Sequence, residues 1–161
     1  LDLRYGFDDK VGIAIILRLA MLKGSPFKVL FTVEEETGGG GVINVDPEFF
    51  GDVSLCITLD RGGFGDMVTS ILGEPLAPDD VIGVVEGVLN VGNFRYERVE
   101  GRPCDARIIS RHVPTVNLSV GIYEMHTKYE YVKIEEAIRT ANAVAHLIGN
   151  RGSLMSPPQE D

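Results

Sequence analysis

One stretch in the first third of the chain decides the fold: FKVLFTVEEETGGGG, residues 27–41. It begins with apolar, aromatic and β-branched residues between a proline and a glycine run, which predicts a buried β-strand over residues 27–33. Three adjacent carboxylates, Glu34, Glu35 and Glu36, follow this strand. Ligands usually bind at that end of a strand in an α/β sheet, and a metal ion would offset the repulsion between the acids. A solvated acidic turn is the alternative that this stretch leaves open.

The composition limits the class of protein. With 161 residues and a hydrophobic fraction of 44%, the chain suits one domain of ordinary size. The formal net charge of -9 argues against a nucleic-acid partner, which needs a basic face. Two cysteines are too few for a disulfide framework, so we expect a reducing, cytoplasmic location. The longest apolar run, residues 11–22, is too short to span a bilayer, so no membrane partner is expected.

Alternating strand and helix patterns organise the rest of the chain. Residues 11–22 are apolar around most of a helix, which we expect to be deeply packed and to stop at Lys23-Gly24. Further expected elements are a short helix at 42–45, strands at 53–59 and 113–121, a strand or loop at 94–99, helices at 81–89 and 134–148, and helical turns at 104–110. The alternation predicts an α/β fold with a central sheet covered on both faces. We expect one domain over residues 1–150 and a mobile tail over residues 151–161.

Two turn-forming clusters have both a structural and a functional interpretation. Asp8 and Asp9 precede the first helix, where one aspartate caps the free N–H groups and the other stays unexplained. The four glycines at 38–41 lack the Gly-Lys-Ser/Thr ending of a phosphate loop, so we reject that function. We expect instead a tight turn in which glycine supplies positive φ angles.

Acids and one histidine gather at the ends of predicted elements. Asp8 precedes the first helix, residues 34–36 follow the first strand, Asp60 follows the second strand, and His126 lies in a later loop. Asp, Glu and His side chains from separate elements, converging on one edge of a sheet, are the typical ligand set of a zinc hydrolase. The other two histidines are expected away from such a site, in a loop and on a helix surface: His112 and His146.

Four short motifs resemble those of one enzyme family. They are FDDKVG at 7–12, TVEEETG at 32–38, LD at 59–60 and MHT at 125–127, supported by PTV at 114–116 and EYV at 130–132. In this order they resemble the co-catalytic zinc aminopeptidases, nearest the glutamyl/tetrahedral aminopeptidases and the tripeptidase T-like enzymes. The resemblance runs from about Gly6 to Ile148. It implies a three-layer α/β/α sandwich with a central mixed sheet.

The resemblance also implies a metal centre and a role for each matched residue. The family carries two zinc ions, for which Co2+ or Mn2+ can substitute. Asp8 would bridge the two metals, Glu36 and His126 would complete one site, and Asp60 would bind the other ion. The family has a Glu-Glu-x-Gly motif whose first glutamate is the general base. Aligning the glycine of this motif with Gly38 makes Glu35 the general base, which takes a proton from water and passes it to the leaving amine.

The sequence departs from the family pattern upstream of the first helix. The family has a His-x-Asp motif there, and this sequence has no histidine before Asp8. Asp8, Glu36 and His126 therefore make one complete three-ligand site, while the second has only Asp8 and Asp60. We expect a missing N-terminal segment, a sheet that is incomplete at its N-terminal edge, and association with that segment or with copies of the chain as a homo-oligomer.

Three functions follow from these observations. The first is a zinc-dependent aminopeptidase, or its catalytic-domain fragment, that hydrolyses N-terminal residues from a peptide substrate. The second is an N-acyl amino acid amidohydrolase of the same superfamily. The third is a truncated, catalytically inactive domain retained for assembly. The motifs do not specify which substrate side chain is accepted.

Overall fold

The computed structural model describes residues 6–21 and 27–155, with only the backbone described at Ser153 and Met155. Its centre is a five-stranded mixed sheet with the strands β1 (Cys56–Arg61), β2 (Asp66–Ile71), β3 (Glu74–Pro75), β4 (Glu97–Gly101) and β5 (Thr115–Ser119). β5 pairs in parallel with β1 and antiparallel with β2, while β2 pairs in parallel with β4 and antiparallel with β3. The prediction of a mixed central sheet is confirmed.

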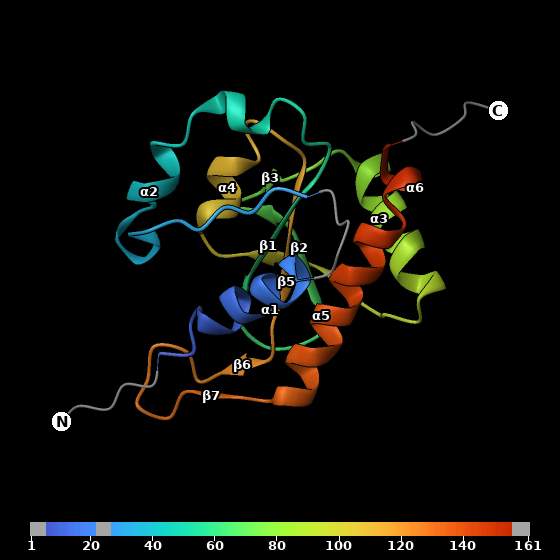
Figure 1. Ribbon diagram of the computed structural model, residues 1–161. Helices are drawn as coiled ribbons and strands as arrows, with labels where there is room; N and C mark the ends of the chain where they lie inside the picture. The colour runs from blue at the N-terminus through green and yellow to red at the C-terminus, as the bar shows by residue number, and fades with distance from the viewer. Residues whose placement is uncertain (1–5, 22–26, 156–161) are drawn as a thin grey trace.

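Helices cover both faces of this sheet (Figure 1). α1 (Lys10–Ala20), α3 (Asp79–Val91) and α5 (Ile134–Gly149) share one apolar cluster with one face of the strands. α2 (Gly40–Ile43), the 3-10 turn η2 (Pro47–Phe50) and α4 (Asp105–Ile109) contribute to two clusters on the other face. The neighbours Met67 and Val68 fall into different clusters, as the alternation of side chains along a strand requires. The predicted α/β/α layering is confirmed.

The expected helices at 81–89, 104–110 and 134–148 correspond to α3, α4 and α5, and the strand at 113–121 corresponds to β5. The strand expected at 53–59 begins later, at Cys56, and continues through Asp60 to Arg61. Within residues 66–75, for which the sequence suggested no element, the structure has β2 and β3 with a turn between them. A small separate sheet joins β6 (Ile122–Tyr123) to β7 (Tyr131–Val132). The expected stop at Lys23-Gly24 lies outside the described residues.

The expectation that the first helix is deeply packed is wrong. Val11, Ile15 and Leu19 are buried, whereas Ile13 and Leu17 on the opposite side are 42% and 53% exposed. Only one stripe of α1 packs against the sheet and α5, while Ile13 lines the open cavity beside β1 and Leu17 is exposed. An apolar circumference therefore does not by itself mean that a helix is surrounded.

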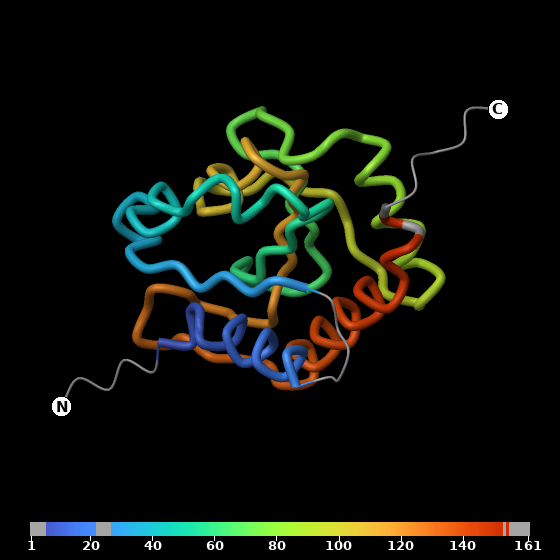
Figure 2. Tube along the Cα trace, turned by 45° about the horizontal axis from the view of Figure 1, so that its top comes forward, coloured from blue at the N-terminus to red at the C-terminus, as the bar shows by residue number. Residues whose placement is uncertain are grey.

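The strand predicted over residues 27–33 is also wrong. The segment has no strand assignment and none of its residues is buried, while Phe31 and Val33 are 48% and 68% exposed. Figure 2 shows it as an extended trace that leads from the grey stretch to α2. A strand requires a hydrogen-bonded neighbour, and in the described part of the chain this segment has none, because β1 is the last strand of the sheet and pairs only with β5.

The last described residues form a short helix, α6 (Arg151–Met155), at the start of the segment for which a mobile tail was predicted. Residues 156–161 lie outside the described part of the chain. Among the described residues, no helix has the length and apolar composition required to cross a bilayer.

Candidate metal centre

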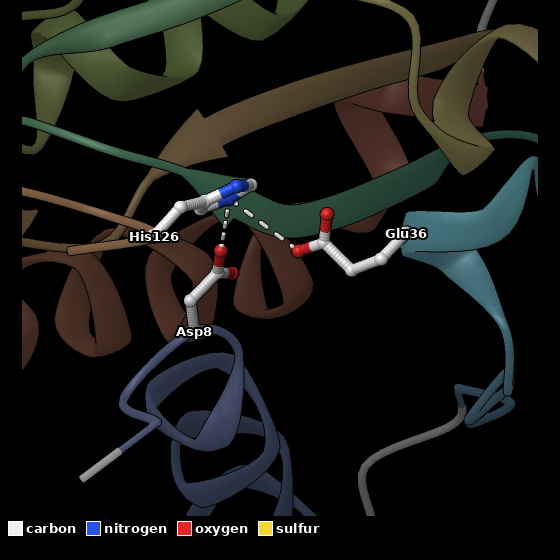
Figure 3. A group of neighbouring side chains, drawn as sticks. All are labelled: Asp8, Glu36 and His126. Atoms are coloured by element: carbon white, nitrogen blue, oxygen red, sulfur yellow. Dashed lines mark ion pairs between the residues drawn. The ribbon is translucent and has the colours of Figure 1, made fainter. Parts of the chain in front are cut away.

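Three of the predicted ligands meet in space. Asp8 comes from the turn before α1, Glu36 from the 3-10 turn η1 (Glu35–Thr37), and His126 from the loop between β6 and β7 (Figure 3). His126 Nε2 lies 2.9 Å from Asp8 Oδ2 and 3.4 Å from Glu36 Oε1. One ligand atom of each residue lies within 4.8 Å of the other two. One imidazole and two carboxylates in this arrangement form a donor set suited to zinc.

A second acidic group shares Asp8. One carboxylate oxygen each of Asp8, Asp9 and Asp60 lie within 4.8 Å of one another. Burial raises the pKa of Asp9 to about 7 and, with added repulsion from Asp9 and Glu35, raises the pKa of Asp60 to about 8. Burial and the nearby Glu36 also raise the pKa of Asp8. Such crowding of carboxylates opposes ionisation, and a cation between them would remove the penalty.

The two adjacent aspartates have separate tasks. Asp9 is the N-cap of α1, since its Oδ1 accepts a hydrogen bond of 2.9 Å from the N–H of Gly12. Gly12 lets the helix start close to the sheet, because an added Cβ would lie 2.2 Å from the carbonyl oxygen of Leu59. The Asp8–Asp9 peptide bond is cis. Asp9 caps the helix, and Asp8 faces His126. The contact with His126 explains the second aspartate, for which helix capping gave no reason.

The glycine run forms the tight turn that the sequence predicted. Gly38 and Gly39 have φ angles of 106° and 73°, and Glu34 also has a positive φ of 60°. An added Cβ at Gly41 would lie 2.4 Å from the carbonyl oxygen of Val33. Glycine is therefore required for this turn to fold back on the preceding segment. The turn presents η1, which carries the next two glutamates, toward the first turn of α1.

Glu35 lies beside the metal-ligand groups but belongs to neither of them. It is half-buried, and burial raises its pKa, with further contributions from Glu36, Asp105 and Asp8. Asp105 on α4 is 8% exposed, and neither of its carboxylate oxygens has a hydrogen-bond partner among the described residues. Sequence analysis missed Asp105, because nothing in residues 104–110 marked it as more than part of a helical turn.

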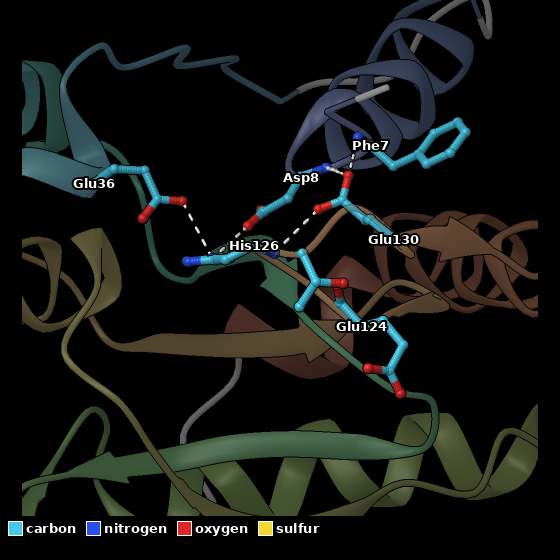
Figure 4. A network of polar contacts seen from close by, with 7 residues as sticks. Phe7, Asp8, Glu36, Glu124, His126 and Glu130 are labelled. Atoms are coloured by element: carbon cyan, nitrogen blue, oxygen red, sulfur yellow. Dashed lines mark hydrogen bonds and ion pairs between the residues drawn. The ribbon is translucent and has the colours of Figure 1, made fainter. Parts of the chain in front are cut away.

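Glu130 holds the two ligand loops together (Figure 4). Its Oε1 accepts hydrogen bonds from the backbone N–H of Phe7 and of Asp8, the latter at 3.4 Å, and its Oε2 accepts one of 3.3 Å from the N–H of His126. A carboxylate that bridges two loops in this way orients their side chains. The sequence marked Glu130 only as part of a matching motif, because two of its partners, Phe7 and Asp8, are more than 120 residues away in the chain.

The loop that carries His126 has an unusual backbone. His126 and Glu124 have φ angles of 63° and 52°, in the left-handed region. The hydroxyl of Thr127 donates a hydrogen bond of 2.7 Å to the carbonyl oxygen of Glu124, which stabilises this conformation. Non-glycine residues in this region cost free energy and are often found at functional sites.

The other two histidines lie away from the centre. The ring of His112 stacks on that of Phe50 with a centroid distance of 5.6 Å. His146 on α5 is half-buried, and its Nε2 lies 3.1 Å from the carbonyl oxygen of Val88 on α3. His146 therefore joins two helices and is less exposed than the helix-surface position that the sequence suggested.

Comparison with known proteins relates this chain to peptidases. No protein-family model matches it. Peptidase T of Salmonella newport (strain SL254) is 35% identical over 102 residues, which span 53% of this chain and 24% of that protein. The uncharacterized protein YqjE of Bacillus subtilis (strain 168) is 33% identical over 94 residues, which span 55% of this chain and 25% of that protein. The chain thus spans about a quarter of the length of these relatives.

Three solved structures, two of them of aminopeptidases, share the fold over most of the chain. Aminopeptidase PepT from Bacillus cereus ATCC 10987 superimposes with a TM-score of 0.75 at 17% identity, over 94% of this chain and 72% of that chain. Aminopeptidase APDkam598 from the archaeon Desulfurococcus kamchatkensis has a TM-score of 0.71 at 20% identity, over 96% of this chain and 51% of that chain. The dodecamer PhTET1-12s has a TM-score of 0.69 at 16% identity, over 88% of this chain and 49% of that chain. The chain therefore has an aminopeptidase-like fold.

Proposed function

We propose that this chain forms the catalytic part of a metal-dependent aminopeptidase, which removes N-terminal residues from peptides. The observation that carries this proposal is the convergence of Asp8, Glu36 and His126 from three separate elements, with Glu35 beside them. The partial similarity to Peptidase T favours a peptidase over an amidohydrolase of the same superfamily.

The residues present fit a divalent cation. We propose that Asp8, Glu36 and His126 hold one zinc ion, or Co2+ or Mn2+ in its place, and that Asp60 with the shared Asp8 holds a second ion. The donor set is that of catalytic zinc sites, and a cation would offset the repulsion between carboxylates that contributes to the raised pKa of Asp60. A bound zinc ion supplies Lewis-acid polarisation of the scissile carbonyl and lowers the pKa of water.

Glu35 has the properties of a general base. The pKa of Glu35 is shifted upward, toward neutral pH. A group whose pKa is near the working pH can both accept a proton and return it. We propose that Glu35 accepts a proton from the attacking water as the new carbon–oxygen bond forms. The same proton then passes to the amine nitrogen as the peptide carbon–nitrogen bond breaks. Glu130 keeps Asp8 and His126 in register during this step by holding both of their loops.

Release of p-nitroaniline from aminoacyl-p-nitroanilides tests the proposed function. We expect zinc-dependent hydrolysis by the purified chain, or by a form extended upstream, with loss of activity in EDTA and recovery on adding zinc. N-acetylated aminoacyl anilides serve as the matched control, because an aminopeptidase requires a free amine. If neither form cleaves the free-amine substrate with zinc present, or if both cleave only the acetylated one, the proposal is wrong.

We also propose that the protein acts as an assembly of copies. One structure of similar fold, PhTET1-12s, is a dodecamer, and α1 exposes the apolar side chains of Ile13 and Leu17. Light scattering after size-exclusion chromatography should give a mass above the 17.6 kDa of one chain. A monomer at the highest attainable concentration would contradict this proposal.

A further inference from the structure

β1 carries one extra residue where it runs beside β5. Two successive pairs of the ladder are Thr58 with Asn117 and Arg61 with Ser119. Between these pairs β1 has two residues, Leu59 and Asp60, whereas β5 has only Leu118. In a regular parallel ladder Asp60 would lie opposite Ser119. An extra residue of this kind is a β-bulge, which bends the strand and redirects the side chains next to it.

The bulge brings two neighbouring residues of β1 to the same helix. Leu59 belongs to the apolar cluster that includes Val11 of α1. A carboxylate oxygen of Asp60 lies within 4.8 Å of one oxygen each of Asp8 and Asp9, directly before the same helix. Neighbouring residues of a regular strand point to opposite faces of the sheet. The place of Asp60 in the second acidic group therefore depends on the bulge.

The side chain of Asn117 contacts the backbone at this bulge. Its Oδ1 accepts a hydrogen bond of 3.2 Å from the N–H of Asp60. Its Nδ2 donates one of 3.6 Å to the sulfur of Cys104, directly before α4. A buried N–H without a partner would cost free energy. The amide oxygen thus supplies an acceptor at the residue where the ladder is out of register.

Asn117 is a polar residue in a fully buried strand. The residues on either side of it, Val116 and Leu118, have no exposed surface and belong to the apolar cluster of α1 and α5, whereas Asn117 is 3% exposed. Burying an amide costs free energy unless its groups are hydrogen-bonded, and an apolar side chain would fill the position without that cost. The hydrogen bond to Asp60 is a task that an apolar side chain could not perform.

We propose that Asn117 is a positioning residue of the candidate metal centre. Its side-chain amide fixes the bulge of β1, and the bulge holds the carboxylate of Asp60 beside Asp8 and Asp9. Changes in residues that support a ligand in this way typically lower metal affinity about 10–100-fold. The inference rests on the proposed function in taking Asp60 as a metal ligand, whereas the hydrogen bond at the bulge can be measured without metal.

Hydrogen exchange, followed by NMR on the metal-free protein, tests the hydrogen bond. Asn117→Leu keeps the approximate size of the side chain and removes both polar groups, so exchange of the Asp60 amide should become at least about tenfold faster. Asn117→Asp keeps an oxygen at the same place and should retain the slow exchange. The amide of Cys56, which donates a hydrogen bond of 2.8 Å to the carbonyl oxygen of Pro114, is the internal reference and should not change.

Calorimetric zinc titration tests the consequence for the metal centre, with the purified chain and with a form extended upstream. We expect Asn117→Leu to weaken binding of the second zinc ion at least about tenfold and to leave the ion at His126 unaffected. Thr115→Val is the matched control, because it removes a buried hydroxyl from the same face of β5. That hydroxyl donates a hydrogen bond of 2.8 Å to the carbonyl oxygen of Val113, away from the bulge. A purely structural role would lower the stability of both variants and the zinc affinity of neither.

Two results would overturn the proposal. Unchanged exchange of the Asp60 amide in Asn117→Leu would show that the side chain does not hold the bulge. Faster exchange without weaker binding of the second zinc ion would show that the hydrogen bond is structural only. If Asn117→Leu does not fold, Asn117→Ser takes its place, since the shorter side chain cannot reach the same N–H.

Failure of the proposed metal centre would be a separate result. If the unmodified protein binds no second zinc ion in either form, the assignment of Asp60 as a ligand is wrong. The exchange of the Asp60 amide then decides alone whether Asn117 positions this residue.

Discussion

β5 and the segment at residues 27–33 have similar strand-like sequences but different structural environments. Every residue of β5 is buried, and the strand pairs with β1 on one side and β2 on the other. Its polar residues are satisfied as well, since Asn117 Oδ1 accepts a hydrogen bond of 3.2 Å from the N–H of Asp60. The segment at 27–33 pairs with no described strand and no residue of it is buried. An apolar run thus becomes a strand only when neighbours supply hydrogen bonds on its edges.

β5 and residues 27–33 also differ in what they contribute to the protein, since the first belongs to the core and the second leads to the candidate metal centre. β5 contributes buried apolar side chains to the core, while the segment at 27–33 leads into the turn that presents Glu35 and Glu36. Carboxylates close together in a half-buried centre oppose folding, so the packed half of the molecule must stabilise the half that carries the proposed chemistry. Substitutions in the two regions should therefore affect different measurements.

The largest effect is expected from Glu35→Gln. The amide keeps the shape of the side chain but cannot accept the proton, so kcat should fall about 10²–10⁴-fold. Because Glu35 belongs to neither ligand group, zinc binding and thermal stability should be retained. The measurement combines anilide hydrolysis with calorimetric zinc titration on an active form of the protein. Glu34→Gln, in the same turn, is the matched control and should keep its activity. If the Glu35 variant loses zinc, then Glu35 is a metal ligand and the assignment of Glu36 as that ligand is wrong.

The packed region should show its effect in stability. Leu118 on β5 has no exposed surface, so Leu118→Ala should lower the free energy of unfolding by about 2–5 kcal/mol. Leu30→Ala deletes the same atoms from a half-buried residue in the open segment and should cost less than about 1 kcal/mol. Urea denaturation followed by circular dichroism measures both. Equal losses would show that the open segment is packed as firmly as β5.

His126→Ala should weaken zinc binding without unfolding the protein. The imidazole is one of three donors in the first ligand group, and its side chain is 59% exposed. Loss of a ligand should cost at least the roughly 10–100-fold in affinity that is typical of changes in residues that support a ligand. Calorimetric titration compares this variant with His112→Ala, which removes a ring stacked on Phe50. Equal zinc affinity in both variants would show that His126 is not a ligand.

The last prediction concerns the dependence of stability on pH in the absence of metal. Asp9 and Asp60 have pKa values of about 7 and about 8 in the folded protein, whereas an unfolded aspartate has a pKa of about 3.9. The folded state therefore holds protons that the unfolded state has released, so stability should fall as the pH rises from about 4 to 8. Thermal unfolding in EDTA should show a melting temperature that falls clearly over this range. Asp60→Asn and added zinc should each flatten the trend, and a melting temperature that rises with pH would contradict it.

Local sequence patterns determined the features that depend on near neighbours in the chain. The apolar spacing of residues 134–148 predicted α5, because helical periodicity arises within one element. Asp9 capped its helix as an aspartate before an apolar run should. The glycines at 38–41 formed the predicted tight turn, which requires positive φ angles that glycine adopts easily. The motifs also singled out Asp8, Glu36 and His126, which the fold brings together.

Only the tertiary structure decided which groups meet across the chain. Glu130 accepts hydrogen bonds from the N–H groups of Phe7 and Asp8, more than 120 residues away. Asp9 joins Asp60 and Asp8 in one acidic group although its local role is to cap a helix. Whether residues 27–33 became a strand depended on a partner beside them, which an apolar pattern does not encode. The sequence specifies which side chains tend to be buried, whereas strand pairing and charge clustering depend on distances that are set only when the layers pack.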